Sequence, residues 1–475
     1  MLAMLLTAME STVVSTAMPT VIGELHGIRL YSWVFSAYLL TSTTTVPIYG
    51  KLADLYGRRP VFLTAMALFL VGSMLSGMAH SMPQLILFRG LQGLGAGGVL
   101  PITLTIIGDL YDIEQRAKVQ VVFTSMWGTA SLAGPVIGAV LTESFSWRWV
   151  FYVNMPFGLI ASYLVGWYLH ENRQRMETVR IDYPGCALMT GAIISVLSLL
   201  QARSMGSFLG LSALSVALIG GLIWQERRAP EPLLPLTLFK HPVIAASMVG
   251  NILIGVMLYA MDSFMPLFMQ AVRGGNAHSG SIVLTPLILC WSLSAFLGAK
   301  TLVRIGFQPV AIFGVTCICV ASFVLIFTNG VTPTPIIILT MALLGTGLGP
   351  ASMAFLVSAQ NAVGWKQRGV VTAASQFFRS IGGTLGVGAL GAVLHAQMMA
   401  RLMDHSMGSI NPNDLLNAAA RASMPPSALM SVRAALAGGL HTVFLLLGGV
   451  TLFCLLNIVR ITRRPVQDLE LDTEG

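Results

Sequence analysis

Four ionisable side chains stand inside long apolar runs of the sequence: Glu10, Arg89, Asp262 and Arg379. A charge near the centre of a membrane-spanning helix costs roughly 2.5–3.5 kcal/mol, so such a residue usually has a partner or a function. A buried carboxylate can hold either a proton or a cation, and one occupant excludes the other. These residue types predict proton-for-cation exchange at Glu10, which Glu10→Gln should abolish without unfolding the protein.

Helical spacing predicts how deep these groups lie. If Met1 is at the inner face, Glu10 is about 13.5 Å deep, close to the middle of a hydrocarbon core about 30 Å thick. Arg379 follows Arg368 by about 16 Å of helix and also approaches the midplane. Two interpretations of Arg379 stay open: it holds a carboxylate, or it binds an anionic group of a substrate.

Asp262 stands about 12 Å from the outer end of its predicted helix, which ends near Gln270. Its neighbours are methionine and aromatic residues, which suit an adaptable apolar pocket. Three roles stay open for Asp262: recognition of a cation, an ion pair with Arg379 or another group, or a charge that reaches the outer rim.

The chain that must position these charges is overwhelmingly apolar. Hydrophobic residues make up 55% of the 475 residues, charged residues only 10%, and the mean hydropathy is +0.78. Soluble domains have about 25% charged residues, whereas each helix that crosses a bilayer needs roughly 20 apolar ones. The composition predicts an all-α polytopic membrane protein, surrounded by a lipid bilayer.

The sequence contains fourteen stretches that are apolar and long enough to be transmembrane helices. They are residues 1–22, 31–50, 61–80, 84–108, 118–142, 149–169, 183–203, 208–225, 243–270, 279–300, 309–328, 335–360, 370–398 and 438–460.

The net charge of +8 is a signal of topology here rather than of nucleic-acid binding. With both ends in the cytoplasm, the inner loops and tail hold 18 of the 27 Lys and Arg residues, and the outer loops hold 7. Basic residues prefer the cytoplasmic side of a membrane. The distribution therefore predicts cytoplasmic termini and an even number of spans.

Two sequence patterns recur after about 250 residues, which predicts a duplicated bundle. Two six-helix halves with an extra pair of helices between them fit this offset, and parallel halves are a known transporter plan. The repeated positions are Gly57, Pro60 and Val61 with Gly306, Pro309 and Val310, and residues 114–116 with residues 366–368.

The predicted division has a six-helix bundle at 1–170, two linking helices within 183–225, a second bundle at 243–460 and a cytoplasmic tail at 461–475. The outer loop 400–436 either packs over the rim or acts as a lid on the outer mouth, and its residues 424–427 are typical of a helix start. The chain is apolar from Met1 onward, so a short cytoplasmic lead is expected to be missing from this numbering.

Other chemistry is not predicted. The five cysteines lie in apolar runs and are expected to be structural. The eight histidines are scattered near span ends, without metal-ligand spacing. No nucleotide loop or catalytic triad can be assembled. We expect neither a metal nor a cofactor, and no enzymatic activity.

The turn from Gly50 to Arg59 resembles a signature of the major facilitator superfamily, found there between the second and third helices. Its glycines, Gly50 and Gly57, permit a tight turn and close helix approach. The resemblance implies that Asp54, Arg58 and Arg59 form a charge latch that holds one conformational state. The second copy has Val303 where Asp54 would fall, so a latch there would be degenerate.

Further motifs are similar to those of the fourteen-helix drug:proton antiporter family within that superfamily. The stretch 89–98, which includes Arg89 and Gln92, resembles a motif that implies proton coupling at Arg89 and substrate contact at Gln92; an alternative is that Arg89 reaches to the outer surface. The stretch 9–19 resembles the family's first-helix motif, with Glu10 in place of the usual aspartate. Residues 146–156 and 376–386 are also similar.

The fifth span resembles the motif that marks exporters of the antiporter type. A proline bends a helix and glycines provide a small face for a neighbouring helix. The motif residues are Gly128, Gly134, Pro135 and Gly138.

Together these resemblances imply a proton-coupled exporter of amphipathic cationic drugs or toxic small molecules in a bacterial plasma membrane. Its partners would be the substrate and protons, and a monomer is the working expectation. One alternative is a dedicated exporter of an endogenous metabolite, siderophore or lipid. Another is a non-transporting membrane scaffold or sensor, against which the charges near the midplane argue.

Overall fold

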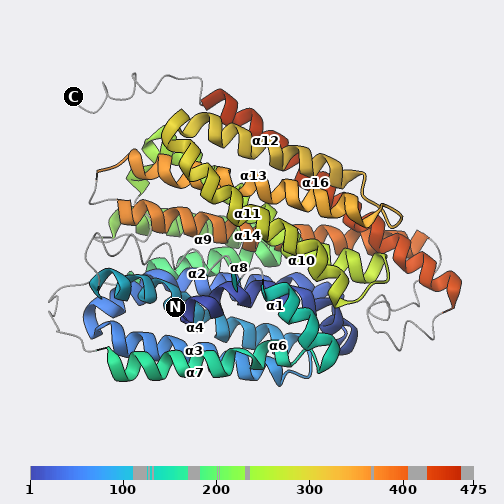
Figure 1. The fold of residues 1–475 in the computed structure, drawn as a ribbon, viewed down its shortest axis with the longest axis horizontal. Coiled ribbons are helices and arrows are strands. Elements are labelled where there is room, and N and C mark those ends of the chain that lie inside the picture. Colours follow the sequence, from blue (N-terminus) through green and yellow to red (C-terminus); the bar gives the residue numbers. More distant parts are fainter. Residues whose placement is uncertain are drawn as a thin grey trace. The chain divides into compact units, whose positions relative to one another are not determined.

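The computed structural model describes residues 2–110, 126, 129–130, 133–169, 182–200, 202, 204–229, 236–364, 368–404 and 425–461. Every regular element among these residues is helical, which confirms the predicted all-α class (Figure 1). The elements before residue 230 are α1 (Leu2–Leu25), η1 (Ile28–Leu30), α2 (Tyr31–Tyr56), α3 (Arg58–Gly77), α4 (Met82–Leu110), α6 (Trp149–Tyr152), α7 (Asn154–Tyr168), α8 (Tyr183–Leu199) and α9 (Met205–Arg228). The later elements are η2 (Leu236–Lys240), α10 (Pro242–Leu267), the π-helical turn η3 (Phe268–Val272), α11 (Ala277–Ile305), α12 (Phe307–Ile326), α13 (Thr334–Asn361), α14 (Arg368–Asp404) and α16 (Pro426–Ile461).

Eleven of the described helices are long and apolar enough to cross a membrane. The shorter helix α8 is also apolar. Helix α2 is less hydrophobic because it carries the run 41–45 of threonine and serine, whose hydroxyls bond to carbonyls three or four residues earlier. The count of fourteen spans stays a prediction, since the fifth span lies partly outside the described residues.

Helix boundaries follow the prediction closely at most spans and depart from it in two places. The predicted sixth span is interrupted at Val153, between α6 and α7. The helix start predicted near Pro426 is confirmed, but the helix continues without a break to Ile461. Residues 426–436 of the predicted outer loop 400–436 are therefore helical, as are 400–404, and 405–424 lie outside the described residues.

The chain forms two compact units. Unit 1 comprises Met1–Leu234, Tyr259–Thr285 and Thr384–Leu440, and unit 2 comprises Pro235–Leu258, Pro286–Gly383 and His441–Gly475. Helices α10, α11, α14 and α16 contribute residues to both units. The predicted boundaries of two bundles and a linking pair stay a prediction.

In unit 1, α4 packs against α2 on one side and α3 on the other, and α3 in turn packs against α7 (Figure 1). Glycines permit this approach: a Cβ added at Gly93 would collide with Thr41 and the Tyr38 carbonyl of α2, and one at Gly95 with the backbone of α3. In a bilayer the hydrophobic effect does not drive helices together, so close packing at small residues contributes to their association instead.

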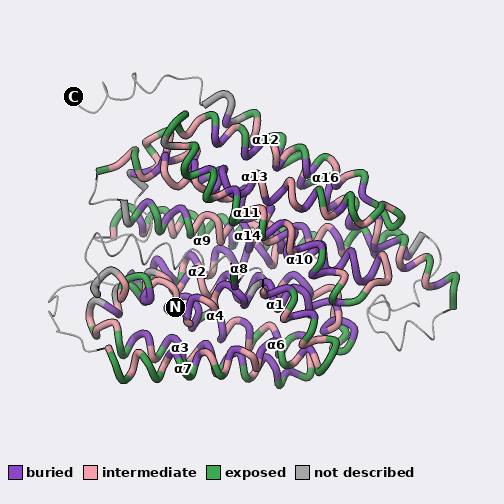
Figure 2. Tube along the Cα trace, viewed as in Figure 1, coloured by how far each residue is buried: buried purple, intermediate pink, exposed green. Residues whose placement is uncertain are grey.

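Unit 2 uses the same device between α12 and α13. A Cβ at Gly314 would collide with the backbone around Ala351, and one at Gly347 with Ile318. By contrast, only Ser215 and Glu226 of helix α9 in unit 1 are buried. Figure 2 shows that α7, at the edge of the same unit, is also exposed along its outer side. Its outward apolar surface suits contact with lipid.

The duplicated turn is confirmed in its backbone. Gly57 ends α2 with φ 92° and ψ 158°, and Gly306 precedes α12 with φ 83° and ψ 173°. In each copy the glycine N–H donates to the carbonyl four residues earlier, over 3.0 Å. Only glycine adopts such positive φ angles at low cost, so the repeat in sequence is a repeat of local structure.

Candidate functional site

Glu10 and Arg89 meet inside unit 1. Glu10 lies on α1 and Arg89 on α4, with 2% and 1% of their surfaces exposed. Arg89 Nη1 donates to Glu10 Oε1, and the two form a salt bridge. Arg89 therefore has a buried partner and does not reach for the outer surface. A buried pair of this kind is costly to break, because removing one partner leaves an uncompensated charge.

Two amides complete the environment of the Glu10 carboxylate. Gln92 Nε2 donates to Oε1 over 3.0 Å, and Asn154 Nδ2 donates to Oε2 over 2.6 Å. Gln92 also accepts from Arg89 Nη1 over 2.7 Å. Four side chains from α1, α4 and α7 are thus tied together through one carboxylate.

Ser73 on α3 anchors the same cluster. Its Oγ accepts from Gln92 Nε2 at 3.2 Å and from Asn154 Nδ2 at 3.0 Å. The hydroxyl donates to the Phe151 carbonyl at 2.9 Å. We call Glu10, Ser73, Arg89, Gln92 and Asn154 the buried polar network, and every hydrogen-bonding position of the Ser73 hydroxyl in it is used.

Local sequence explains how these groups reach one another. The guanidinium of Arg89 lies 4.2 Å from the centre of the Tyr38 ring, and 5.8 Å from that of Phe151, so aromatic faces hold the cation. Gly72 of α3 faces the backbone of Gln92, where a Cβ would not fit. The break before α7 places Asn154 at its first position.

Asp262 lies apart from this network, on α10 but also within unit 1. It is buried, with 7% of its surface exposed, and Ser15 Oγ of α1 lies 3.0 Å from its Oδ1. Among the described residues of its unit it has no salt bridge. Nearby, Tyr31 of α2 donates to the carbonyl of Ser263, and Gln270 Nε2 donates to the carbonyl of Thr16 over 3.0 Å.

Arg379 belongs to unit 2, where it lies on α14 and is partly buried. Its Nη2 donates to Gln376 Oε1, one helical turn earlier. The backbone here is closely packed, since a Cβ at Gly255 of α10 would collide with the Arg379 carbonyl. Whether Arg379 binds an anionic group or a carboxylate stays a prediction.

The predicted latch is described only in part. Arg58 Nη1 donates to the Ala53 carbonyl over 3.2 Å, across the turn at Gly57. Arg59 lies in the first turn of α3, and the side chain of Asp54 lies outside the described residues. Gly50 was expected to allow a turn or a close approach, but it lies inside α2 with no described atom within 4 Å of an added Cβ.

The exporter-like motif of the fifth span packs against α1. Residues 129–130 and 133–144 are helical, which includes Pro135, and Gly128 lies outside the described residues. A Cβ at Gly134 would collide with Thr12 Oγ1, and one at Gly138 with Thr16 Oγ1. The two glycines thus bring this helix onto the face of α1 that follows Glu10.

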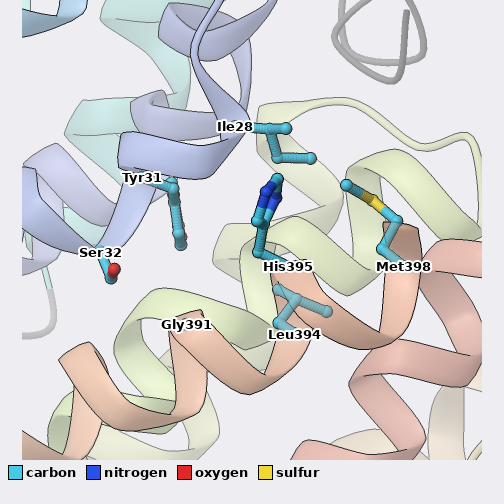
Figure 3. A pocket seen from close by; sticks show the side chains of 7 residues that line it. All are labelled: Ile28, Tyr31, Ser32, Gly391, Leu394, His395 and Met398. Atoms are coloured by element: carbon cyan, nitrogen blue, oxygen red, sulfur yellow. The ribbon is translucent and has the colours of Figure 1, made fainter. Parts of the chain in front are cut away.

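A small pocket lies in unit 1 between the start of α2 and α14. Figure 3 shows the His395 ring pointing toward Ile28, with Tyr31 on the other side of the pocket. The volume of this pocket is close to that of one water molecule. A drug-sized ligand needs a far larger volume. The lining residues are Ile28, Tyr31, Ser32, Gly391, Leu394, His395 and Met398.

Sequence reasoning did not find three contributors: Ser73, Asn154 and Ser15. Asn154 lies in a stretch that the sequence marks as motif-like, and its amide was a usable signal there. Ser73 and Ser15 carry none, because a serine in an apolar helix usually bonds its own backbone. Among the described residues, no three His, Cys, Asp or Glu side chains gather in a way that could hold a metal ion.

Comparison with known proteins identifies relatives along most of the chain. The model of the Major Facilitator Superfamily matches residues 1–387. The chain is similar to "Multidrug transporter protein MdtP" of Bacillus subtilis (strain 168), with 38% identity over 413 residues, covering 85% of this chain and 75% of the relative. It is also similar to "Multidrug resistance protein 3" of the same organism, with 30% identity over 469 residues, covering 94% and 90%.

Solved structures resemble this fold as well. A bacterial homologue of the human lysosomal transporter Spinster superposes with a TM-score of 0.72, covering 97% of this chain and 96% of that one. Sequence identity is 16%, so this likeness concerns the fold alone. The family model spans most of this chain, and the relatives match it over most of their own length. This integral membrane protein therefore belongs to the major facilitator superfamily.

Proposed function

We propose that this protein is a secondary exporter of amphipathic small molecules, which it exchanges for protons by alternating access. The similarity to transporters named for multidrug transport and resistance supports the substrate class. The observation that carries the coupling is the buried polar network, because it holds a carboxylate and a guanidinium cation together away from water.

Glu10 is the coupling carboxylate in this proposal. When ionised, it accepts from Arg89, Gln92 and Asn154, which ties α1 to α4 and α7. A proton on Glu10 cancels its charge and leaves the Arg89 cation without compensation in a buried place, so the network must rearrange. Proton binding thereby changes how α1 is held, and this links the gradient to the conformational cycle.

The direction and setting follow the same proposal. Export fits the packing of Gly134 and Gly138 onto α1, because this puts the antiporter-like motif beside the coupling helix. The distribution of basic residues supports cytoplasmic termini in a bacterial plasma membrane.

The decisive experiment measures drug uptake driven by a pH gradient in inside-out vesicles, with wild type, Glu10→Gln and Glu10→Asp. Glu10→Gln should reduce proton-driven uptake at least about a hundredfold, because glutamine cannot bind or release the coupling proton. Glu10→Asp keeps the carboxylate and should retain measurable coupling.

A folding control separates lost coupling from lost structure. Glu10→Gln alone leaves Arg89 unpaired, so the double variant Glu10→Gln/Arg89→Gln, which removes both charges, is compared for melting temperature and yield. A double variant that is folded but uncoupled supports the proposal. Wild-type rates of proton-driven uptake in Glu10→Gln would refute it.

A further inference from the structure

Asp262 differs from Glu10 in what compensates its charge. Glu10 has Arg89 and two amides, whereas Asp262 is similarly buried with one hydroxyl neighbour, Ser15, and no salt bridge among the described residues of its unit. Burying an ionised carboxylate without a counter-charge is far more costly than burying the neutral acid. The site is therefore stable with a proton on Asp262, or with a cation beside it.

Ser15 is built to accept either state. Its Oγ lies 3.0 Å from Asp262 Oδ1 and 2.9 Å from the Thr12 carbonyl, but a hydroxyl has only one proton to donate. When Asp262 is ionised, Ser15 donates to it. When Asp262 carries a proton, that proton is donated to Ser15 Oγ and the Ser15 hydroxyl turns to Thr12. Both states are satisfied by rotating one hydroxyl.

The surroundings suit an aromatic cation. Tyr31 and Phe264 lie with ring centres 6.1 Å apart, and Phe35 lies 5.4 Å from Tyr31. Aromatic faces attract cations when water is excluded. The adjacent Ser263 Oγ is buried and has no hydrogen-bond partner among the described residues, which leaves a polar atom available to a ligand.

The backbone beside Asp262 is also irregular. Pro266 follows one turn later, and the helix then widens into the π-helical turn η3. Such widened turns are frequent at functional sites. Gln270 in η3 bonds to the Thr16 carbonyl, so the widened segment is fastened to the same helix that carries Ser15.

Few other titratable groups lie around Asp262. Tyr31 faces it from α2, and Tyr259 precedes it on α10. On α14, His395 lies across the small pocket from Tyr31 (Figure 3). On α1, Glu10 is occupied by Arg89. No described lysine or arginine of the unit neutralises the Asp262 carboxylate.

We propose that Asp262 is a second exchange site, at which the cationic nitrogen of a monovalent amphipathic substrate replaces a proton. The proposal rests on the proposed function and adds a substrate class and a stoichiometry to it. On the inner side the O–H bond of Asp262 breaks, its proton passes to water, and the cation takes its place against the carboxylate. On the outer side the cation leaves and a proton from water returns.

This arrangement sets the charge balance of transport. Glu10 and Asp262 together bring two protons inward for each monovalent cation exported, which moves one net positive charge inward. A neutral substrate leaves Asp262 protonated throughout and is exchanged for the single proton of Glu10.

The test uses purified full-length protein in proteoliposomes, with imposed pH gradients or membrane potentials and an entrapped pH dye. The probes are ethidium as the aromatic cation and radiolabelled chloramphenicol as the neutral amphipathic molecule. In Asp262→Asn, ethidium transport should fall at least about tenfold. The ethidium transport that remains should no longer respond to membrane potential. Chloramphenicol transport should stay within about twofold of wild type.

Three results would overturn the proposal: equal loss of both substrates in Asp262→Asn, unchanged ethidium transport in it, or a sodium requirement that this variant abolishes. Proton-driven transport of neither probe by wild type would instead count against the proposed function, and this inference would fall with it.

A second variant addresses Ser15 as a positioning residue. In Ser15→Ala the ionised carboxylate loses its hydroxyl donor and releases its proton less readily, so the pH midpoint of ethidium uptake should move upward by about one unit. Ser36→Ala is the matched control, because Ser36 donates to the Thr384 carbonyl and touches no carboxylate. An unshifted midpoint in Ser15→Ala would contradict the two-state role of this hydroxyl.

Discussion

Asn154 shows why single residues matter in the buried polar network. Its amide donates to both Glu10 and Ser73 and so joins the Glu10 carboxylate to α3. Sequence reasoning identified Glu10 and Arg89 because charges in apolar helices are conspicuous. It did not identify Ser73 and Asn154 as members of the network, because a polar uncharged residue has no such cost and its contacts come from helices far apart in sequence.

We expect Asn154→Leu to destabilise the protein by about 1–3 kcal/mol, since it leaves one oxygen of a buried carboxylate without its donor. Melting of the detergent-solubilised protein measures this loss. Asn361→Ala, at the exposed end of α13, is the control and should melt like wild type. Equal melting temperatures of Asn154→Leu and wild type would mean that the hydrogen bonds of Asn154 do not contribute to stability.

Between elements, the contact of the fifth span with α1 depends on glycine. A Cβ at Gly138 collides with Thr16 Oγ1 and the nearby Val13 carbonyl, whereas one at Gly210 of α9 meets nothing within 4 Å. Gly138→Ala should therefore cost about 1–3 kcal/mol through overpacking. Gly210→Ala should instead stabilise its helix by about 0.5–1 kcal/mol. Melting curves of the two variants test these opposite expectations. A lower melting temperature in both variants would contradict the different packing of Gly138 and Gly210.

The duplicated turn allows a second test by glycine-to-alanine substitution. Gly57→Ala and Gly306→Ala force a side chain into positive φ and should each cost about 1–2 kcal/mol. Gly50→Ala, inside α2 with open space around it, should be neutral or stabilising. Chemical denaturation in mixed micelles compares the stabilities of the three variants. A loss of stability in Gly50→Ala alone would contradict the assignment of the positive-φ positions to Gly57 and Gly306.

The helices themselves were largely predictable, because apolar length is a direct consequence of bilayer thickness. Every predicted span except the fifth falls on a described helix. The departures have local causes. Helix α16 begins as early as Pro426 because the residues that follow this proline contain no further helix breaker before Gly438. The pairing of Asp262 with Ser15 could not be predicted, since it joins residues 247 positions apart and leaves no periodic trace.

For the molecule as a whole, the distribution of basic residues makes a prediction about topology. A fluorescent protein fused after Gly475 should fold and fluoresce in the cytoplasm, and alkaline phosphatase fused there should be inactive. The same reporters fused in the 405–424 segment should give the opposite result. Phosphatase activity at the C-terminus would contradict a cytoplasmic C-terminus, and would mean either an odd number of spans or a reversed assignment of inner and outer loops.

Ser73 has a consequence for the speed of the protein. Its hydroxyl already accepts from Gln92 and Asn154 and donates to Phe151. Among the described residues, Arg89 Nε is buried without a hydrogen-bond partner and is itself a donor. When Glu10 is protonated, Arg89 keeps the neutral Gln92 oxygen as an acceptor, but no described residue of unit 1 replaces the lost negative charge. Water has to enter instead. Turnover should then be limited by hydration of this site rather than by the size of the gradient, so steeper gradients would raise the rate only until water entry becomes the slow step.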